Sequence, residues 1–382
     1  MKKSLVLMAM AGVALAGCVN DEVADVLQKE QGKTLLRFDS PVLYNNESRT
    51  IYGELGTYEH NGGFVSYPTN ESFIIYAIKH PVSGGDLNAW PVTPTPCAFN
   101  GQAISYDRNV DGWVPRTSNG DYYYWSSDYK LSFAATSPAD LEQGADWNEE
   151  TNRTFSNKGL TIKDFTVPQV GQQYDLLYTD AILNKSITDA NENTTDGTKY
   201  EGVFVKFKHA LTAIHISISK DEGYKSNVIL KSVTLKNVQN KGSFQSIVSE
   251  GAKYWTAEEN RVDYPILANG NIFFPATDAG MHIKELDEEG KAQSLLIMPQ
   301  TLTESVTLDV AYTVNGAPIT KSIKLIDTDN NSETDNDVKE WQMGTKYTYH
   351  LHLSGSSESL KKIYFAPSTE GWQPGKTTVI EL

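Results

Sequence analysis

Cysteine, basic residues and recognisable catalytic motifs are all scarce in this sequence. It has 2 cysteines in 382 residues, and its 33 lysines and arginines stand against 48 acids, for a formal net charge of −15. Basic patches bind nucleic acids, so this balance argues against nucleic acid as a partner. No G-x-S-x-G, H-E-x-x-H, P-loop, dinucleotide-binding or C-x-x-C motif is present. The sequence therefore predicts that the chain is not an enzyme and needs no cofactor.

Long apolar runs are also missing. The run from Leu5 to Gly17 follows two lysines and is too short to cross a membrane, which takes about 20 helical residues. Its charged start and small final residues are typical of a secretory signal peptide. Leu15–Cys18 also resembles a bacterial lipobox, which implies that residues 1–17 are removed and that Cys18 is acylated. The alternative is an ordinary signal peptide followed by a chance cysteine.

Lipidation of Cys18 would leave Cys97 as the only thiol, so no disulfide within the chain is expected. Removing residues 1–17 deletes two lysines and no acids, so 31 basic residues face 48 acids and the charge becomes −17. Several acyl chains hold a protein on a membrane, because each buried CH₂ contributes about 0.8 kcal/mol. Residues 18–34 are polar and acidic, and we interpret them as a tether between the lipid and the folded body.

Beyond Leu35 the apolar residues mostly alternate with a period of two, which is typical of β-strands. The segment 71–81 is apolar on both faces, as expected of a central strand. Asn315-Gly316 separates two alternating runs and predicts a hairpin. In 345–353 the alternation turns Tyr347, Tyr349, Leu351 and Leu353 inward. Helical periodicity is limited to short stretches near 139–148. Many short strands between turn residues predict an all-β protein made of antiparallel sandwiches.

The polar stretch 184–202 is the best candidate seam between two sandwiches, which we place at 35–190 and 200–382. Directly after it, apolar residues occupy odd positions from Val203 to Phe207 and even positions from Ile214 to Ile218. A one-residue slip moves every side chain of a strand to the other face. The sequence therefore predicts a β-bulge or a tight bend between Lys208 and Ala213.

Several segments, in order and spacing, resemble the fimbrillin family, the subunits of type V pili in anaerobic Gram-negative bacteria. Two of them, "YDLLYTDAILN" and "VFVKFKHALTAIHISI", lie in the middle of the chain. Together with the lipobox, the similar segments span nearly the whole mature chain: 129–138, 174–184, 203–218, 233–244, 295–312, 341–354 and 360–373.

The resemblance implies two tandem antiparallel sandwiches of Greek-key, transthyretin-like topology and a particular route of assembly. Subunits of this family reach the outer membrane as lipoproteins, and the acidic residues after Cys18 resemble a signal for export to the cell surface. An arginine-specific protease then removes an N-terminal segment with its first strand. The groove left behind accepts a strand from another fimbrial subunit, in homo- or hetero-polymers. The result is an adhesive fimbrium built by donor-strand exchange.

Candidates for each of these parts are present. Arg49 lies between polar residues, and cleavage there would release the expected first strand, Leu35–Tyr44; Arg37 is the second candidate, inside an apolar stretch. Both could also be ordinary surface arginines. The C-terminal segment 376–382 is the candidate donor strand, with the β-forming residues Val379, Ile380 and Leu382. A plain terminal edge strand would have the same pattern.

The main alternative is a monomeric surface lipoprotein that binds glycan through exposed aromatic residues. The segment 121–129 gathers four tyrosines and Trp125, although beside a strand such residues more often pack in a core. His350 and His352 have the spacing of a pair on one strand face, and 327–337 is rich in acids. The acidic segment departs from the EF-hand template, and we interpret the histidines as a plain strand face. No metal site is therefore predicted.

Overall fold

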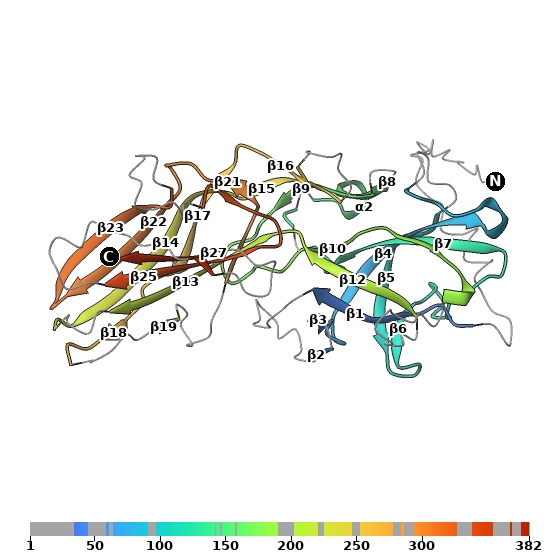
Figure 1. Ribbon diagram of the computed structural model, residues 1–382, viewed down its shortest axis with the longest axis horizontal. Coiled ribbons are helices and arrows are strands. Elements are labelled where there is room, and N and C mark those ends of the chain that lie inside the picture. Colours follow the sequence, from blue (N-terminus) through green and yellow to red (C-terminus); the bar gives the residue numbers. More distant parts are fainter. Residues whose placement is uncertain are drawn as a thin grey trace, which may run out of the picture.

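The computed structural model confirms an all-β protein with several sheets. It describes residues 34–44, 59–60, 64–90, 97–141, 143–145, 147–156, 159–189, 202–220, 225–246, 253–277, 284–285, 294–326, 338–353, 367–368 and 376–381. The molecule is elongated, with one β-body at each end of its long axis (Figure 1). Within those residues the only α-helix is the single turn α2 (Glu149–Asn152), and no helix there is long and apolar enough to span a membrane.

The N-terminal β-body is a ten-stranded sheet in which most neighbours are antiparallel. The pairing of β12 with both β10 and β1 joins the ends of the strand path β12-β10-β7-β4-β5-β6-β1. Its strands are β1 (Phe38–Tyr44), β2 (Glu59–His60), β3 (Phe64–Ser66), β4 (Ser72–Pro81), β5 (Cys97–Asp107), β6 (Gly112–Pro115), β7 (Tyr129–Ser137), β10 (Leu177–Thr179), β11 (Ile182–Lys185) and β12 (Val203–His209).

β4 is the central strand that the sequence predicts. Every side chain from Phe73 to Ile78 is buried, because one face of β4 packs in the N-terminal core and the other lies under neighbouring elements. Short 3-10 turns, η1 (Val82–Gly84) and η2 (Ile187–Asp189), follow β4 and β11. A strand with two buried faces reads as a continuous apolar run rather than as an alternating one.

The chain passes between the two β-bodies at Ala210-Leu211, between β12 and β13 (Thr212–Lys220). This is the interval in which the sequence predicts a bulge or bend. The sequence also placed the start of the second sandwich at residue 200, whereas the structure places residues 203–209 in the first sheet. The reason is that the odd-numbered apolar residues of β12 fill the N-terminal core. The change of parity therefore marks a change of sheet.

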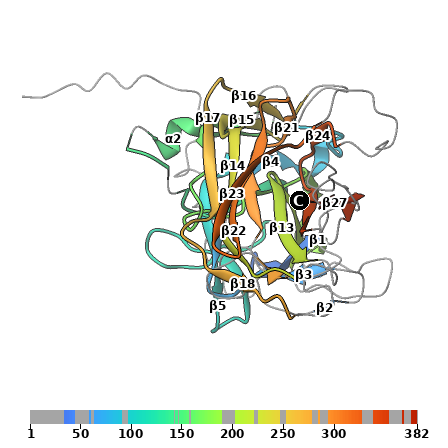
Figure 2. The same cartoon turned by 90° about the vertical axis from the view of Figure 1, so that its left-hand side faces the viewer.

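The C-terminal β-body consists of two sheets that share one apolar core. In Figure 2 the sheet of β14 stands beside the sheet of β13 as a separate layer. The first comprises β14 (Val228–Gln239), β17 (Arg261–Leu267), β18 (Ile272–Phe274), β22 (Thr307–Val314) and β23 (Ala317–Lys324). The second comprises β13, β19 (Lys284–Glu285), β20 (Leu295–Ile297), β25 (Lys346–Leu353), β26 (Pro367–Ser368) and β27 (Lys376–Glu381). A two-stranded sheet pairs β21 (Gln300–Thr301) with β24 (Glu340–Trp341).

The predicted hairpin joins β22 to β23. Asn315 and Gly316 have φ angles of 49° and 87°, as a two-residue turn with two left-handed positions requires. β23 pairs only with β22 within the described residues, and its exposed positions include Pro318 and Lys324. Proline and lysine on an exposed strand discourage pairing with another chain. This edge is therefore protected from further strand addition.

A four-stranded sheet connects the two β-bodies (Figure 1). Its strands β8 (Arg153–Ser156) and β9 (Gly159–Thr166) precede the crossover, whereas β15 (Lys241–Gln245) and β16 (Trp255–Ala257) follow it. β9 and β15 pair directly, with Phe244 opposite Ile162. Side chains of this connecting sheet belong to the same apolar cluster as the C-terminal core. Covalent crossover and connecting sheet together join the two bodies.

Candidate functional site

The first strand and the residues before it lie inside the N-terminal sheet. The Leu36 N–H donates to the Tyr123 carbonyl at 2.9 Å, and the Trp125 N–H donates to the Thr34 carbonyl at 2.9 Å. On the other side β1 runs parallel to β12, with Phe38 opposite Val203. Further along, β1 pairs with β3. β1 is therefore an interior strand with neighbours on both edges.

Residues of this segment also complete the N-terminal core. The side chains of Leu36 and Phe38 are both 0% exposed. The Phe38 ring packs edge-to-face on Phe133 and Phe73, with centroid distances of 5.4 and 6.2 Å. Fully burying side chains of this size contributes about 1.5–3 kcal/mol each. Removing the segment would leave an apolar groove lined by aromatic rings.

Of the two candidate cleavage sites, Arg37 lies within the described residues. The Arg37 carbonyl accepts a hydrogen bond from the Val203 N–H at 2.9 Å, so its peptide group is part of the sheet. A protease needs an extended, accessible segment, and a paired strand resists cleavage. Arg49 and the lipidation site Cys18 lie outside the described residues. Pro41 cannot donate a ladder hydrogen bond, and the β1–β12 register shifts between Asp39 and Val42.

The candidate donor segment forms β27, which runs parallel to β25 (Figure 1). Val379 is the register partner of His350, and Ile380 is the register partner of Leu351. Leu382 lies outside the described residues. On its other edge, in the described part of the chain, β27 pairs with β26 at Thr377 and Lys376. The candidate donor segment therefore lies next to the last strand of its sheet.

The aromatic segment 121–129 contributes two of its five rings to the N-terminal core. Tyr123 is 6% exposed and Trp125 is 1% exposed. The Tyr122 ring instead lies under the Arg116 guanidinium, with 3.7 Å between the ring centroid and Cζ. Its hydroxyl donates a hydrogen bond to the Asp107 carboxylate at 3.0 Å. Because Trp125 is buried, its ring is not available to stack on a sugar.

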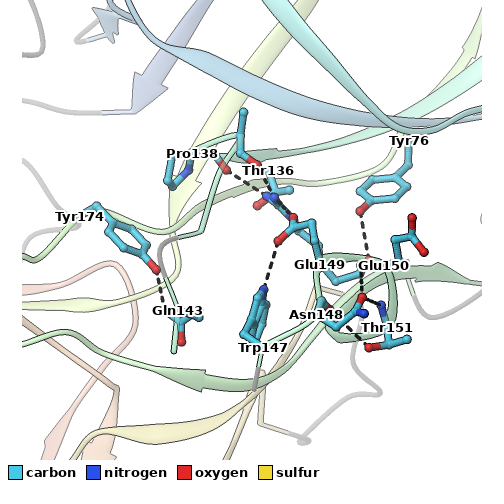
Figure 3. Close-up of polar contacts among 12 residues, drawn as sticks. Tyr76, Thr136, Pro138, Gln143, Trp147, Asn148, Glu149, Glu150, Thr151 and Tyr174 are labelled. Atoms are coloured by element: carbon cyan, nitrogen blue, oxygen red, sulfur yellow. Dashed lines mark hydrogen bonds and ion pairs between the residues drawn. The ribbon is translucent and has the colours of Figure 1, made fainter. Parts of the chain in front are cut away.

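A polar network stabilises the connection between the two bodies (Figure 3). The buried Arg153 guanidinium donates to the carbonyls of Pro138 and Ala139 and forms an ion pair with Glu149 of α2. Burial lowers the pKa of Arg153. The Tyr76 hydroxyl donates to the Arg153 carbonyl at 3.3 Å, and burial raises the pKa of Tyr76 to about 12. These contacts hold α2 and β8 against β4 and β7.

Neighbouring contacts fix the local backbone of the same region. The Asn148 side chain accepts hydrogen bonds from the first N–H groups of α2, as an N-cap does. The Trp147 indole donates to Glu149 at 3.1 Å, and Gln143 donates to the Tyr174 hydroxyl at 2.6 Å (Figure 3). Every one of these groups is engaged with another protein group. The network therefore has a positioning role.

His350 of β25 lies between two serine side chains of β13. The two ring nitrogens of His350 lie 2.7 Å from the hydroxyls of Ser217 and Ser219 on β13. No group of three histidine, cysteine, aspartate or glutamate side chains that could hold a metal occurs in the part of the chain that the structure describes. The acidic segment 327–337 lies outside that part.

The family model described as fimbrillin-like matches residues 87–372, about three quarters of the chain. The chain belongs to the fimbrillin-like family. This membership confirms the resemblance inferred from the sequence, and with it the expectation of a fimbrial or cell-adhesion protein rather than an enzyme. No curated protein matches the chain.

Solved structures similar to this fimbrillin-like chain include proteins of Bacteroides species. One from Bacteroides uniformis, described as a "putative cell adhesion protein", is 14% identical with a TM-score of 0.43, over 85% of this chain and 95% of that one. A similarly described protein of Bacteroides ovatus is 13% identical with the same TM-score, over 91% and 99% of the two chains. A fimbrial protein of Bacteroides ovatus is 12% identical with a TM-score of 0.33, over 89% of this chain and 54% of that one.

Two features of the site could not be read from the sequence. The parallel pairing of β1 with β12 joins residues more than 160 positions apart, and no local pattern encodes it. Arg153 gave no sign of burial, because its neighbours in sequence are polar. A useful signal is the aromatic Phe155, two residues later, which stacks on Tyr76.

Proposed function

We propose that this fimbrillin-like chain is a lipid-anchored subunit of a surface fimbrium that polymerises by donor-strand exchange. Proteolysis after Arg49 would release β1, and β27 of a neighbouring subunit would take its place beside β12. The product is an open head-to-tail polymer, because donor and acceptor lie at opposite parts of the chain. Lipidated Cys18 would hold the unprocessed subunit on the outer membrane, facing the cell exterior.

The observation that carries this proposal is the shared orientation of the two terminal strands. β1 runs parallel to β12, and β27 runs parallel to β25. A strand that already pairs in parallel with the last long strand of one body can add to the corresponding strand of another body without reversing direction. Main-chain hydrogen bonds would supply affinity, and side-chain pockets would set the register.

The same pairings support a tandem arrangement of two related sandwiches. In the N-terminal body the first and last strands, β1 and β12, are parallel neighbours. In the C-terminal body the first strand β13 and the long strand β25 are parallel neighbours over eight register pairs. We propose that both bodies share the transthyretin-like Greek-key topology, with their boundary at Ala210-Leu211.

The proposal is tested by proteolysis of the purified mature protein with an arginine-specific protease. The expected result is a ladder of SDS-resistant oligomers that requires N-terminal trimming and the segment 376–382. Arg49→Lys should block trimming, whereas the matched variant Arg37→Lys should not. Stable monomers after complete trimming would refute strand exchange for this chain.

The anchor is tested separately by growth with labelled palmitate. Label should be incorporated into the wild-type protein and lost in Cys18→Ser. Equal labelling of both proteins would show that Cys18 is not the acylated residue. Because this test does not involve polymerisation, it separates the anchoring proposal from the assembly proposal.

A further inference from the structure

The core beside the first strand contains a buried hydrogen-bond donor that is not used. Within the described residues, the indole Nε1 of Trp125 has no hydrogen-bond partner, and the side chain is 1% exposed. A buried donor of this kind is destabilising, because folding removes it from water and gives nothing in return. Such groups are rare enough in folded proteins that each asks for an explanation.

The position of Trp125 ties this donor to the strand that is exchanged. Its backbone N–H donates to the Thr34 carbonyl, and the bridge between Leu35 and Tyr124 lies directly beside it. Trp125 belongs to the same apolar cluster as Leu36 and Phe38. In this antiparallel pairing the exposed Thr34 lies opposite Trp125, and the buried Leu36 lies opposite Tyr123. Leucine and phenylalanine side chains have no acceptor, so the resident segment places none at its two fully buried positions.

The candidate donor segment differs from the resident one at this point. In "KTTVIEL", residues 376–382, each central aliphatic residue follows a threonine two positions earlier. If Ile380 takes the place of Phe38, Thr378 takes the place of Leu36; if Val379 does so, Thr377 takes that place. Successive side chains of a strand alternate between faces, so both registers put a hydroxyl where the resident strand has a leucine.

We propose that the Trp125 indole N–H selects the incoming strand by donating a hydrogen bond to a threonine hydroxyl two residues before the aliphatic residue that fills the Phe38 position. This inference rests on the proposed strand exchange and names the chemistry that the groove recognises: an extended segment of the pattern hydroxyl-x-aliphatic, carried by a second copy of this chain. The exchange replaces an unsatisfied donor with a satisfied one, which distinguishes this incoming segment from one that carries no hydroxyl at that position.

The test measures binding of a fluorescent peptide of residues 374–382 to the protein trimmed after Arg49. Three peptides are compared: wild type, Thr377→Val and Thr378→Val, since valine keeps the shape of threonine and removes its hydroxyl. One of the two valine peptides should bind about tenfold more weakly, the worth of one hydrogen bond. The other should stay within about twofold, because its side chain lies on the opposite face. It serves as the matched control and reveals the register.

The same peptides are then bound to trimmed Trp125→Phe protein, in which the tenfold difference should vanish. If both valine peptides bind the wild-type groove as tightly as the threonine peptide, or if the difference persists in Trp125→Phe, the inference is wrong while strand exchange stands. Absence of any peptide binding, together with absence of ladders, would instead overturn strand exchange itself and this inference with it.

A second measurement covers the case in which Trp125→Phe does not fold. In wild-type protein labelled with ¹⁵N-tryptophan, one indole N–H resonance should shift and become protected from hydrogen exchange with the threonine peptide. The valine peptide that binds weakly should leave that resonance unprotected. Equal protection by both peptides would overturn the inference without the need for the variant.

Discussion

The first strand β1 and the last strand β27 are paired in the same way but are held very differently. Both run parallel to a long strand of their own body. β1 has neighbours on both edges, and the segment that it belongs to buries Leu36 and Phe38 completely. Among the residues that the structure describes, β27 has β25 on one edge and the two-residue β26 on the other. Removing an interior strand breaks hydrogen bonds on both edges and exposes core side chains, whereas removing a strand near the sheet margin breaks fewer contacts.

The largest difference should appear when one buried ring of the β1 strand is removed. Phe38→Ala deletes a fully buried side chain in contact with Phe73 and Phe133, and we expect a loss of about 3–5 kcal/mol in the free energy of unfolding. Urea denaturation measures it. Val82→Ala, at an exposed position, is the control and should stay within about 0.5 kcal/mol. A loss below 1 kcal/mol for Phe38→Ala would contradict the view that β1 is essential to its core.

A second buried feature of the N-terminal half is the Arg153 network, which holds the connecting sheet against β4 and β7. Arg153→Ala leaves Glu149 without its buried partner and two carbonyls without their donor, so we expect a loss of about 3 kcal/mol. Arg261→Ala removes an exposed guanidinium that donates to the Asn237 carbonyl and should cost about 0.5 kcal/mol. If the two variants are equally stable in urea, the Arg153 network is not what joins the bodies.

Alkaline pH should weaken both bodies, because each buries tyrosines. Burial raises the pKa of Tyr67 in the N-terminal core and of Tyr349 opposite β27. A raised folded pKa means that the stabilisation is complete below pH 10, the unfolded value, and is lost as the pH rises toward the folded value. The free energy of unfolding should therefore be flat to about pH 9 and then fall by about 1.4 kcal/mol per pH unit for each such tyrosine.

Tyr67→Phe tests this pH dependence. The variant should show a shallower decline above pH 10 than the wild type in urea titrations at fixed pH values. An unchanged slope would mean that Tyr67 ionises equally easily in the folded and unfolded chains.

The smallest effect should come from deleting residues 376–382. Four register pairs join β27 to β25, and each backbone hydrogen bond contributes about 0.5–1.5 kcal/mol net. Ordering each residue costs about 1–2 kcal/mol, so the two contributions nearly cancel. We expect a change below about 1 kcal/mol in thermal or urea unfolding. A loss above about 3 kcal/mol would show that β27 is as firmly held as β1.

Local patterns in the sequence predicted the individual strands well. The continuous apolar run of β4, the hairpin at Asn315-Gly316 and the change of parity after Lys208 were each visible in a few neighbouring residues. What the pattern could not supply was which strands become neighbours. β12 reads as an ordinary alternating strand, and only its pairing with β10 and β1 assigns it to the first body.

The candidate site was predictable to a similar extent. The first strand and the C-terminal strand were predicted from β-forming residues, and Phe38–Tyr44 and Lys376–Glu381 are strands in the structure. The unsatisfied indole of Trp125 could not be found, because burial of a donor without an acceptor depends on the whole core around it. Arg49, Cys18 and Leu382 remain predictions.

The parallel pairing of β13 with β25 has a mechanical consequence. A pull that enters at the start of β13 and leaves at the end of β25 acts along two neighbouring strands in opposite senses, so it loads all eight register pairs in shear. Interstrand hydrogen bonds loaded in shear must break together, whereas hydrogen bonds loaded from one end of a strand pair break one after another. We therefore expect single-molecule pulling along this direction to find the C-terminal body resistant to mechanical unfolding.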